Sequence, residues 1–197
     1  MKSNIKIILI SLVGIFLMSV IALLVIFLAN KSRSDILVYG KVPEFSFTER
    51  SGLNFGTDEM KGKINIVNFF FTGCKGPCPI MNTRVAELYK KFITTDEVQF
   101  VSLSVDPDRD SLKVLKEYAE TYGVTDNRWL FTRAPIEEVH RVSEKGFMLA
   151  GELPTIHSTK LILVDRDLNT RGYYDSFEEE HLRTLITHVR ELLYANQ

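Results

Sequence analysis

The chain has 197 residues, of which 45% are hydrophobic, and it carries 24 basic against 25 acidic side chains. With 11 glycines, 6 prolines and 2 cysteines, it is neither collagen-like nor disordered, and it has too few cysteines for a disulfide scaffold. A formal net charge of -1 argues against nucleic acid as a partner, because that binding requires a basic surface that neutralises phosphates.

The segment from Ile7 to Ala29 has 23 residues and no charged side chain. A helix of that length extends about 35 Å, enough to cross a hydrocarbon core of about 30 Å. The apolar region of a cleaved signal peptide is usually shorter, about 7 to 15 residues. The sequence therefore predicts one membrane-spanning helix that stays in the protein.

Basic residues stand on both sides of this segment, Lys2 and Lys6 before it and Lys31 and Arg33 after it. The short tail in front favours an amino terminus in the cytoplasm, with the rest of the chain outside it. No Arg-rich, Ser-rich presequence precedes the segment, which favours a bacterial inner membrane with the domain on its periplasmic side.

The expected organisation is a tail and membrane anchor over residues 1–30, a polar linker over 31–41 and one domain over 42–197. Three nearly continuous apolar runs in this domain predict strands buried on both faces. These runs are Ile64 to Phe71, Val98 to Val105 and Leu161 to Val164.

Helical patterns separate these strands, with apolar faces around Met81 to Tyr89, Leu112 to Tyr122 and Leu182 to Leu193. A turn signal from Asn169 to Gly172, followed by Tyr173 and Tyr174, predicts an antiparallel hairpin before the last helix. A βαβ unit followed by a ββα unit is typical of an α/β protein with the thioredoxin-like fold, a central mixed sheet flanked by helices.

Both cysteines, Cys74 and Cys78, lie just after the first buried strand and at the start of the next helix. Open α/β sheets place their sites at the carboxyl ends of strands. Two thiols four residues apart on one helical turn can form a disulfide or share a metal ion. A helix N-terminus and the neighbouring Lys75 should make at least one thiol more acidic.

A purely structural disulfide would close a very short ring and stabilise the fold little. The pair is therefore expected to be reactive or metal-binding. His157, four residues before the strand at Leu161, is the candidate third ligand, because its loop should face the cysteines. Two thiolates and an imidazole make a soft site suited to copper(I), with zinc as the alternative.

At these residues the chain resembles the SCO/SenC family, over about Val42 to Ile186. Three residues separate the cysteines here, whereas ordinary thioredoxins have two. The resemblance is carried by Pro43 to Phe45 in an opening strand, Gly62 and Lys63, Phe70 to Pro79 with Met81, Ser104 to Asp110, Leu115 to Tyr118, Trp129 in a loop of its own, and His157 with Ser158.

The resemblance implies a membrane-anchored, thioredoxin-like metallochaperone that binds copper through Cys74, Cys78 and His157. It implies two partners, a copper donor protein and the subunit of cytochrome c oxidase that bears the copper A centre. The alternative function is a thiol:disulfide oxidoreductase, in which Cys74 and Cys78 cycle as a redox pair and keep oxidase cysteines reduced.

Several other residues have less specific patterns. Asp106, Asp108 and Asp110 imitate part of a calcium loop, but Ser111 stands where glycine is needed. Asp108 or Asp110 is instead expected to cap the following helix, and Asp106 to lie at the surface or beside the copper site. Three histidines are expected on solvated helix faces, and Met81 in the core. These histidines are His140, His181 and His188.

Overall fold

The computed structural model describes residues 2–31, 36–149 and 158–195. The chain divides into two units, one containing α1 (Lys2–Lys31) and the other running from Ile36 to Leu192. The apolar segment expected to be helical lies within α1. In the described parts of the chain, no helix combines the length and the apolar character that a membrane crossing requires. The predicted membrane anchor thus stays a prediction.

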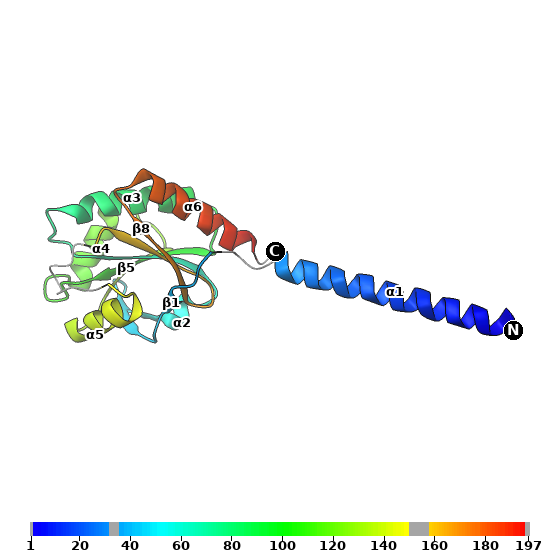
Figure 1. Ribbon diagram of the computed structural model, residues 1–197. Coiled ribbons are helices and arrows are strands. Elements are labelled where there is room, and N and C mark those ends of the chain that lie inside the picture. Colours follow the sequence, from blue (N-terminus) through cyan, green and yellow to red (C-terminus); the bar gives the residue numbers. More distant parts are fainter. Residues whose placement is uncertain (1, 32–35, 150–157, 196–197) are drawn as a thin grey trace. The chain divides into compact units, whose positions relative to one another are not determined.

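The second unit is built on one mixed sheet of eight strands, in the order β1-β8-β7-β4-β5-β6-β2-β3 (Figure 1). The strands are β1 (Gly40–Lys41), β2 (Ser46–Glu49), β3 (Asn54–Gly56), β4 (Ile64–Phe70), β5 (Val98–Ser104), β6 (Trp129–Arg133), β7 (Lys160–Val164) and β8 (Asn169–Asp175). The helices are α2 (Thr57–Met60), α3 (Pro77–Lys91), α4 (Leu112–Thr121), α5 (Ile136–Arg141), a π-helical turn (Val142–Gly146) and α6 (Glu179–Tyr194).

The centre of the sheet is parallel. β4 pairs with β5 along its whole length, from Ile64 opposite Val98 to Phe70 opposite Ser104, and β6 continues in the same direction beside β5. On the other side of β4, β7 pairs antiparallel with β4, and β8 pairs antiparallel with β7. Because parallel strands end at the same edge, the loops that follow β4, β5 and β6 all leave one edge of the sheet.

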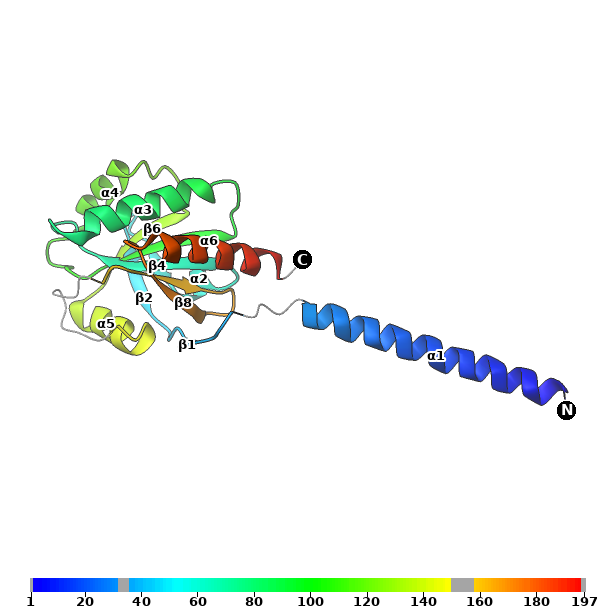
Figure 2. The same ribbon diagram turned by 45° about the horizontal axis from the view of Figure 1, so that its top comes forward.

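Side chains of β4 alternate between two buried layers, as the pleat of a strand requires. Val67 and Phe69 belong to the core cluster that includes Val139 of α5. Asn68 points the other way and donates to Asn82 of α3. Figures 1 and 2 show α3 and α6 over one face of the sheet and α5 across the other. This two-sided burial explains why the run from Ile64 is apolar at nearly every position.

The three predicted strands, the hairpin and the three long helices of the domain are confirmed. Two expectations about the strands are wrong. Trp129 does not lie in a loop: it is the first residue of β6 and is fully buried. The segment Pro43 to Phe45 is not a strand, because β1 ends at Lys41 and β2 begins at Ser46. β6 has only five residues, so pairing with β5 decides its structure more than its own short pattern.

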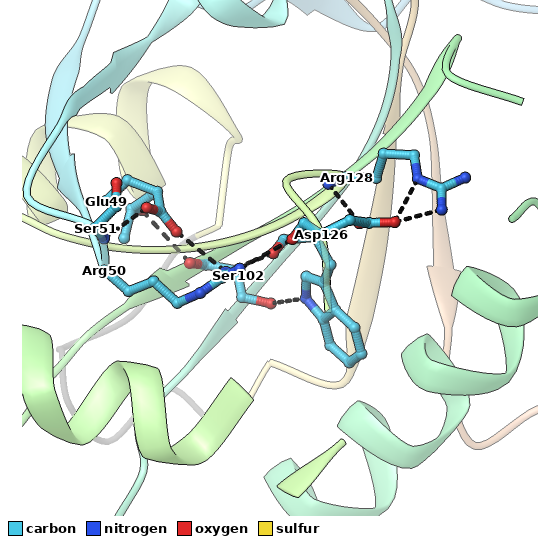
Figure 3. A network of polar contacts seen from close by, with 8 residues as sticks. Glu49, Arg50, Ser51, Ser102, Asp126 and Arg128 are labelled. Atoms are coloured by element: carbon cyan, nitrogen blue, oxygen red, sulfur yellow. Dashed lines mark hydrogen bonds and ion pairs between the residues drawn. The ribbon is translucent and has the colours of Figure 1, made fainter. Parts of the chain in front are cut away.

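A polar network joins β2 to the segment before β6 (Figure 3). The Arg50 guanidinium donates to the carbonyl oxygens of Trp129, at 2.6 Å, and Asp126, at 3.0 Å, and it lies over the Phe131 ring. The Asp126 carboxylate accepts from the backbone N–H of Arg128, at 2.9 Å, and from its Nε, at 2.8 Å. These contacts hold in place the segment that leads into β6 and the first residue of that strand.

Asp126 predicts an acid dependence of stability. Burial acts to raise the pKa of its carboxyl, but hydrogen bonds from Arg128 outweigh this and lower the pKa. A lowered pKa in the folded state stabilises the fold above the unfolded pKa of about 3.9, and this stabilisation is lost as the pH falls through the folded value. Asp126→Asn should therefore lower the free energy of unfolding most at neutral pH and progressively less in acid.

Urea denaturation across this pH range measures the difference between variant and parent. Asp167→Asn is the matched control, since Asp167 is exposed and its loss should change the free energy of unfolding little. A difference between Asp126→Asn and parent that does not change with pH would contradict the assignment.

Candidate metal centre

The two cysteines lie where β4 gives way to α3. Cys74 is in the loop after β4, and Cys78 is the second residue of α3. Pro77 begins this helix, at a position where no backbone N–H is needed. The predicted placement, at the carboxyl edge of the sheet and at a helix N-terminus, is confirmed.

Both thiols are shielded from solvent, with 7% of Cys74 and 3% of Cys78 exposed. No disulfide joins them. Burial raises the pKa of the Cys78 thiol to about 12, helped by a hydrogen bond with the Cys74 side chain. Cys78 is therefore not the thiol that the sequence predicts to be more acidic, because desolvation of its thiolate outweighs the favourable backbone hydrogen bonds, the larger of which comes from Phe71.

The third predicted ligand, His157, lies outside the described residues. Within the described ranges, no three side chains of the His, Cys, Asp or Glu type come together as a metal site. Ser158 and Thr159 lead into β7, which pairs antiparallel with β4, Ile162 lying opposite Val67. The amino end of β7 is thus at the edge of the sheet from which the cysteine loop departs.

A buried carboxylate holds the start of the cysteine loop. Asp110, fully buried, accepts hydrogen bonds from the backbone N–H of Thr72, at 3.2 Å, from its Oγ1, at 2.5 Å, and from Ser104 Oγ, also at 2.5 Å. Burial raises the pKa of this carboxyl above its ordinary value. The helix-capping role predicted for Asp108 or Asp110 is wrong: Ser111 caps α4, accepting from the Val114 N–H.

A second polar chain lies beneath the first turn of α3. Asn82, one turn after Cys78, accepts from Asn68 of β4 at 3.0 Å and donates to the Tyr118 hydroxyl at 3.0 Å. Ser102 donates to Asn68 at 2.7 Å and accepts from the Trp129 indole at 2.9 Å. The start of α3 is thereby tied through β4 and β5 to β6.

Sequence reasoning missed this chain and the contact between Asp110 and Thr72. The one available signal was the presence of Asn68 and Ser102 within strands predicted to be fully buried, because a buried polar side chain needs a partner. The partners of these two side chains come from α3 and β6, and spacing along the chain does not reveal them.

The remaining candidates take part in local structure. Met81 is 1% exposed, which confirms its place in the core. Asp106 forms an ion pair with Arg109, at 3.4 Å. His188 is only partly exposed, and its Nδ1 shares a 2.6 Å hydrogen bond with the Tyr174 hydroxyl, so it is packed against β8 and does not lie on a purely solvated face.

Comparison with known proteins assigns this architecture. A sequence model described as SCO1/SenC matches residues 39–193. The chain belongs to the SCO1/SenC family. The SCO1 protein homolog of Bacillus subtilis is 30% identical over 157 residues, which cover 76% of this chain and 81% of that protein. A protein of Stutzerimonas stutzeri named as copper-binding is 28% identical over 146 residues, covering 67% and 68% of the two chains.

Solved structures of the SCO1/SenC family agree in fold. BsSco, described as having a disulfide switch and as a member of the Sco family of cytochrome c oxidase assembly proteins, superimposes with a TM-score of 0.72 at 28% identity. The match covers 81% of this chain and 96% of that one. The expected mixed sheet flanked by helices is confirmed.

The environment of Cys78 predicts a late titration. In Cys74→Ser, Cys78 is the only cysteine, and its burial should keep the thiol protonated well above the ordinary pKa of 9.0. Ultraviolet absorbance of the thiolate, followed during a pH titration of the reduced, metal-free protein, measures this. Ionisation at or below the ordinary value would show that desolvation does not govern this thiol.

Proposed function

We propose that this SCO1/SenC protein binds copper as cargo through Cys74, Cys78 and His157 and delivers it to the copper A centre of cytochrome c oxidase. The observation that carries the proposal is the pair of buried, mutually hydrogen-bonded thiols at the carboxyl edge of the sheet. The names of the relatives, one for copper binding and one for oxidase assembly, support the same function.

The donor set fits copper(I) better than other first-row metals. Thiolates are soft ligands that favour copper(I), and their shielding from water limits oxidation and hydrolysis of a bound ion. Zinc also accepts two thiolates and an imidazole, so metal preference is part of the test. A cargo ion must leave again, which suits a small donor set with one ligand on a separate loop.

His157 is the proposed third ligand because of the course of the chain beside it. Ser158 and Thr159 lead into β7 at the edge where the cysteine loop leaves β4. His157 directly precedes Ser158 in the sequence. The pairing of β7 with β4 therefore supports His157 as the third ligand.

Replacement of either cysteine should abolish tight copper(I) binding, because a lone thiolate cannot chelate a soft ion. We expect Cys74→Ser and Cys78→Ser each to lose stoichiometric copper(I) in competition with a chromophoric chelator. His157→Ala should weaken copper(II) binding more than copper(I) binding, since imidazole is the harder ligand.

Two variants serve as matched controls for this series. Met81→Leu removes a buried thioether from the same helix, and His140→Ala removes a histidine of α5. Both should bind copper as the parent does. Parent-like binding by both cysteine variants, or loss of binding in the controls, would refute the assigned ligand set.

A second function rests on the hydrogen bond between the two thiols. Two thiols at hydrogen-bonding distance can be oxidised to a disulfide after a small adjustment. This is the chemistry of a thiol:disulfide oxidoreductase acting on oxidase cysteines. Reductase activity that survives His157→Ala while copper binding is lost would favour this function over copper delivery.

The location is also a proposal, and it rests on the sequence from Ile7 to Ala29. Residues 1–30 would act as cytoplasmic tail and anchor, 31–41 as linker, and 42–197 as a domain outside the cytoplasm. Copper is handled there away from cytosolic glutathione, which would compete for the ion.

An exposed cysteine reports this location better than the buried pair. In a Cys74→Ser, Cys78→Ser background, Leu53→Cys places a thiol at a position that is 70% exposed. A membrane-impermeant thiol reagent should label this cysteine in spheroplasts or protoplasts, in which the cytoplasmic membrane is intact and its outer face is accessible. Ser3→Cys in the same background should react only after lysis. The reverse pattern would place the domain in the cytoplasm.

A further inference from the structure

The position of Cys74 relative to Cys78 depends on the short loop between β4 and α3. Cys78 sits in a helix whose first turns are buried against β4 and tied to it through Asn82 and Asn68. Cys74 has no such helix around it: its backbone N–H donates to the Phe71 carbonyl, at 3.3 Å, and closes a tight turn. Whatever fixes this turn sets the separation of the two sulfurs.

Thr72 is the second residue of that turn, and it donates two separate hydrogen bonds to Asp110. The carboxylate accepts from both the backbone N–H and the hydroxyl of Thr72. Its other oxygen accepts from Ser104, the last residue of β5. Asp110 therefore connects the cysteine loop to the end of the neighbouring parallel strand.

This carboxylate is costly for the fold. Asp110 is fully buried, and a buried carboxylate loses its hydration and regains only part of that free energy from neutral donors. An apolar residue would avoid this cost but would leave the donors of Thr72 and Ser104 without their acceptor. The hydrogen bonds of this carboxylate go to one loop and one strand end beside the two thiols, so the geometry of that loop depends on Asp110.

We propose that Asp110 is the positioning residue of the copper site: by holding Thr72 it fixes Cys74 at the separation from Cys78 that one shared copper ion requires. This inference rests on the proposed copper-binding function. Asp110 does not itself contact the ion in this proposal. It controls the turn that carries Cys74, one of the ligands of the ion.

The test compares copper affinity in three variants with that of the parent. Thr72→Val removes the hydroxyl donor but keeps the carboxylate, whereas Asp110→Asn removes the charge and one acceptor. Loss of groups that orient a metal ligand typically lowers affinity by about 10- to 100-fold, and we expect a decrease in this range for copper(I), with an altered thiolate-to-copper(II) absorption band. Thr72→Ser, which keeps the hydroxyl, should restore both to the parent values.

Asp108→Asn is the matched control for charge. Asp108 lies two residues before Asp110 in the same connection but is exposed, so its loss should change neither affinity nor spectrum. If Asp108→Asn lowered copper affinity as much as Asp110→Asn, negative charge near the carboxyl edge of the sheet would govern the affinity, and a positioning role for Asp110 would be refuted. If Asp110→Asn fails to fold, Thr72→Val against Thr72→Ser decides the question.

A copper-free measurement separates this inference from the proposed function. Both thiols are buried, so alkylation by iodoacetamide requires the loop to open. Loss of a hydrogen bond to a charged group should speed alkylation in Thr72→Val and Asp110→Asn by about tenfold or more. A parent that binds no copper would refute the proposed function, whereas parent-like alkylation and affinity in both variants would refute the role of Asp110.

Discussion

The parallel pairing of β4 with β5 is the constraint on which the rest of the site depends. Seven residue pairs in register, from Ile64 opposite Val98 to Phe70 opposite Ser104, bring the ends of both strands to one edge. The cysteine loop follows β4, and the connection with Asp110 follows β5. Thr72 and Asp110, which are 38 positions apart in the sequence, therefore become neighbours and form a hydrogen bond. A shift of register would separate them and turn buried side chains toward the wrong layer.

Around the cysteines, desolvation competes with the electrostatics of the helix start. The N-terminus of α3 favours a thiolate, but Cys78 is 3% exposed and burial raises the pKa of its thiol. Burial dominates because few favourable contacts replace the water that a thiolate would lose. Burial thus favours the protonated Cys78 thiol in the reduced, metal-free protein, and a soft metal ion that binds there would have to displace this proton.

Two polar systems hold the two sides of this pair in different ways. Asn82 and Asn68 hold the Cys78 side, joining a helix to a central strand through neutral amides. On the Cys74 side, Asp110 holds a loop through a buried charge. The first system is extended and reaches from α3 through β4 and β5 to β6, whereas the second concentrates its hydrogen bonds on Thr72 and Ser104. The loop side is accordingly the more sensitive to a single substitution.

Strands β4, β5, β7 and β8, the long helices of the domain, the thioredoxin-like order and the placement of Cys74 and Cys78 were predictable from the sequence, because hydrophobic periodicity and the spacing of two thiols are local properties. The carboxyl-edge location also followed, since it depends only on what comes after a buried strand. The burial of Trp129 at the start of a strand and the inward turn of Asp110 to Thr72 could be seen only in the tertiary structure. Each of these depends on a partner from a distant part of the chain, and hydrogen bonds and burial between distant segments leave no periodic pattern in the sequence.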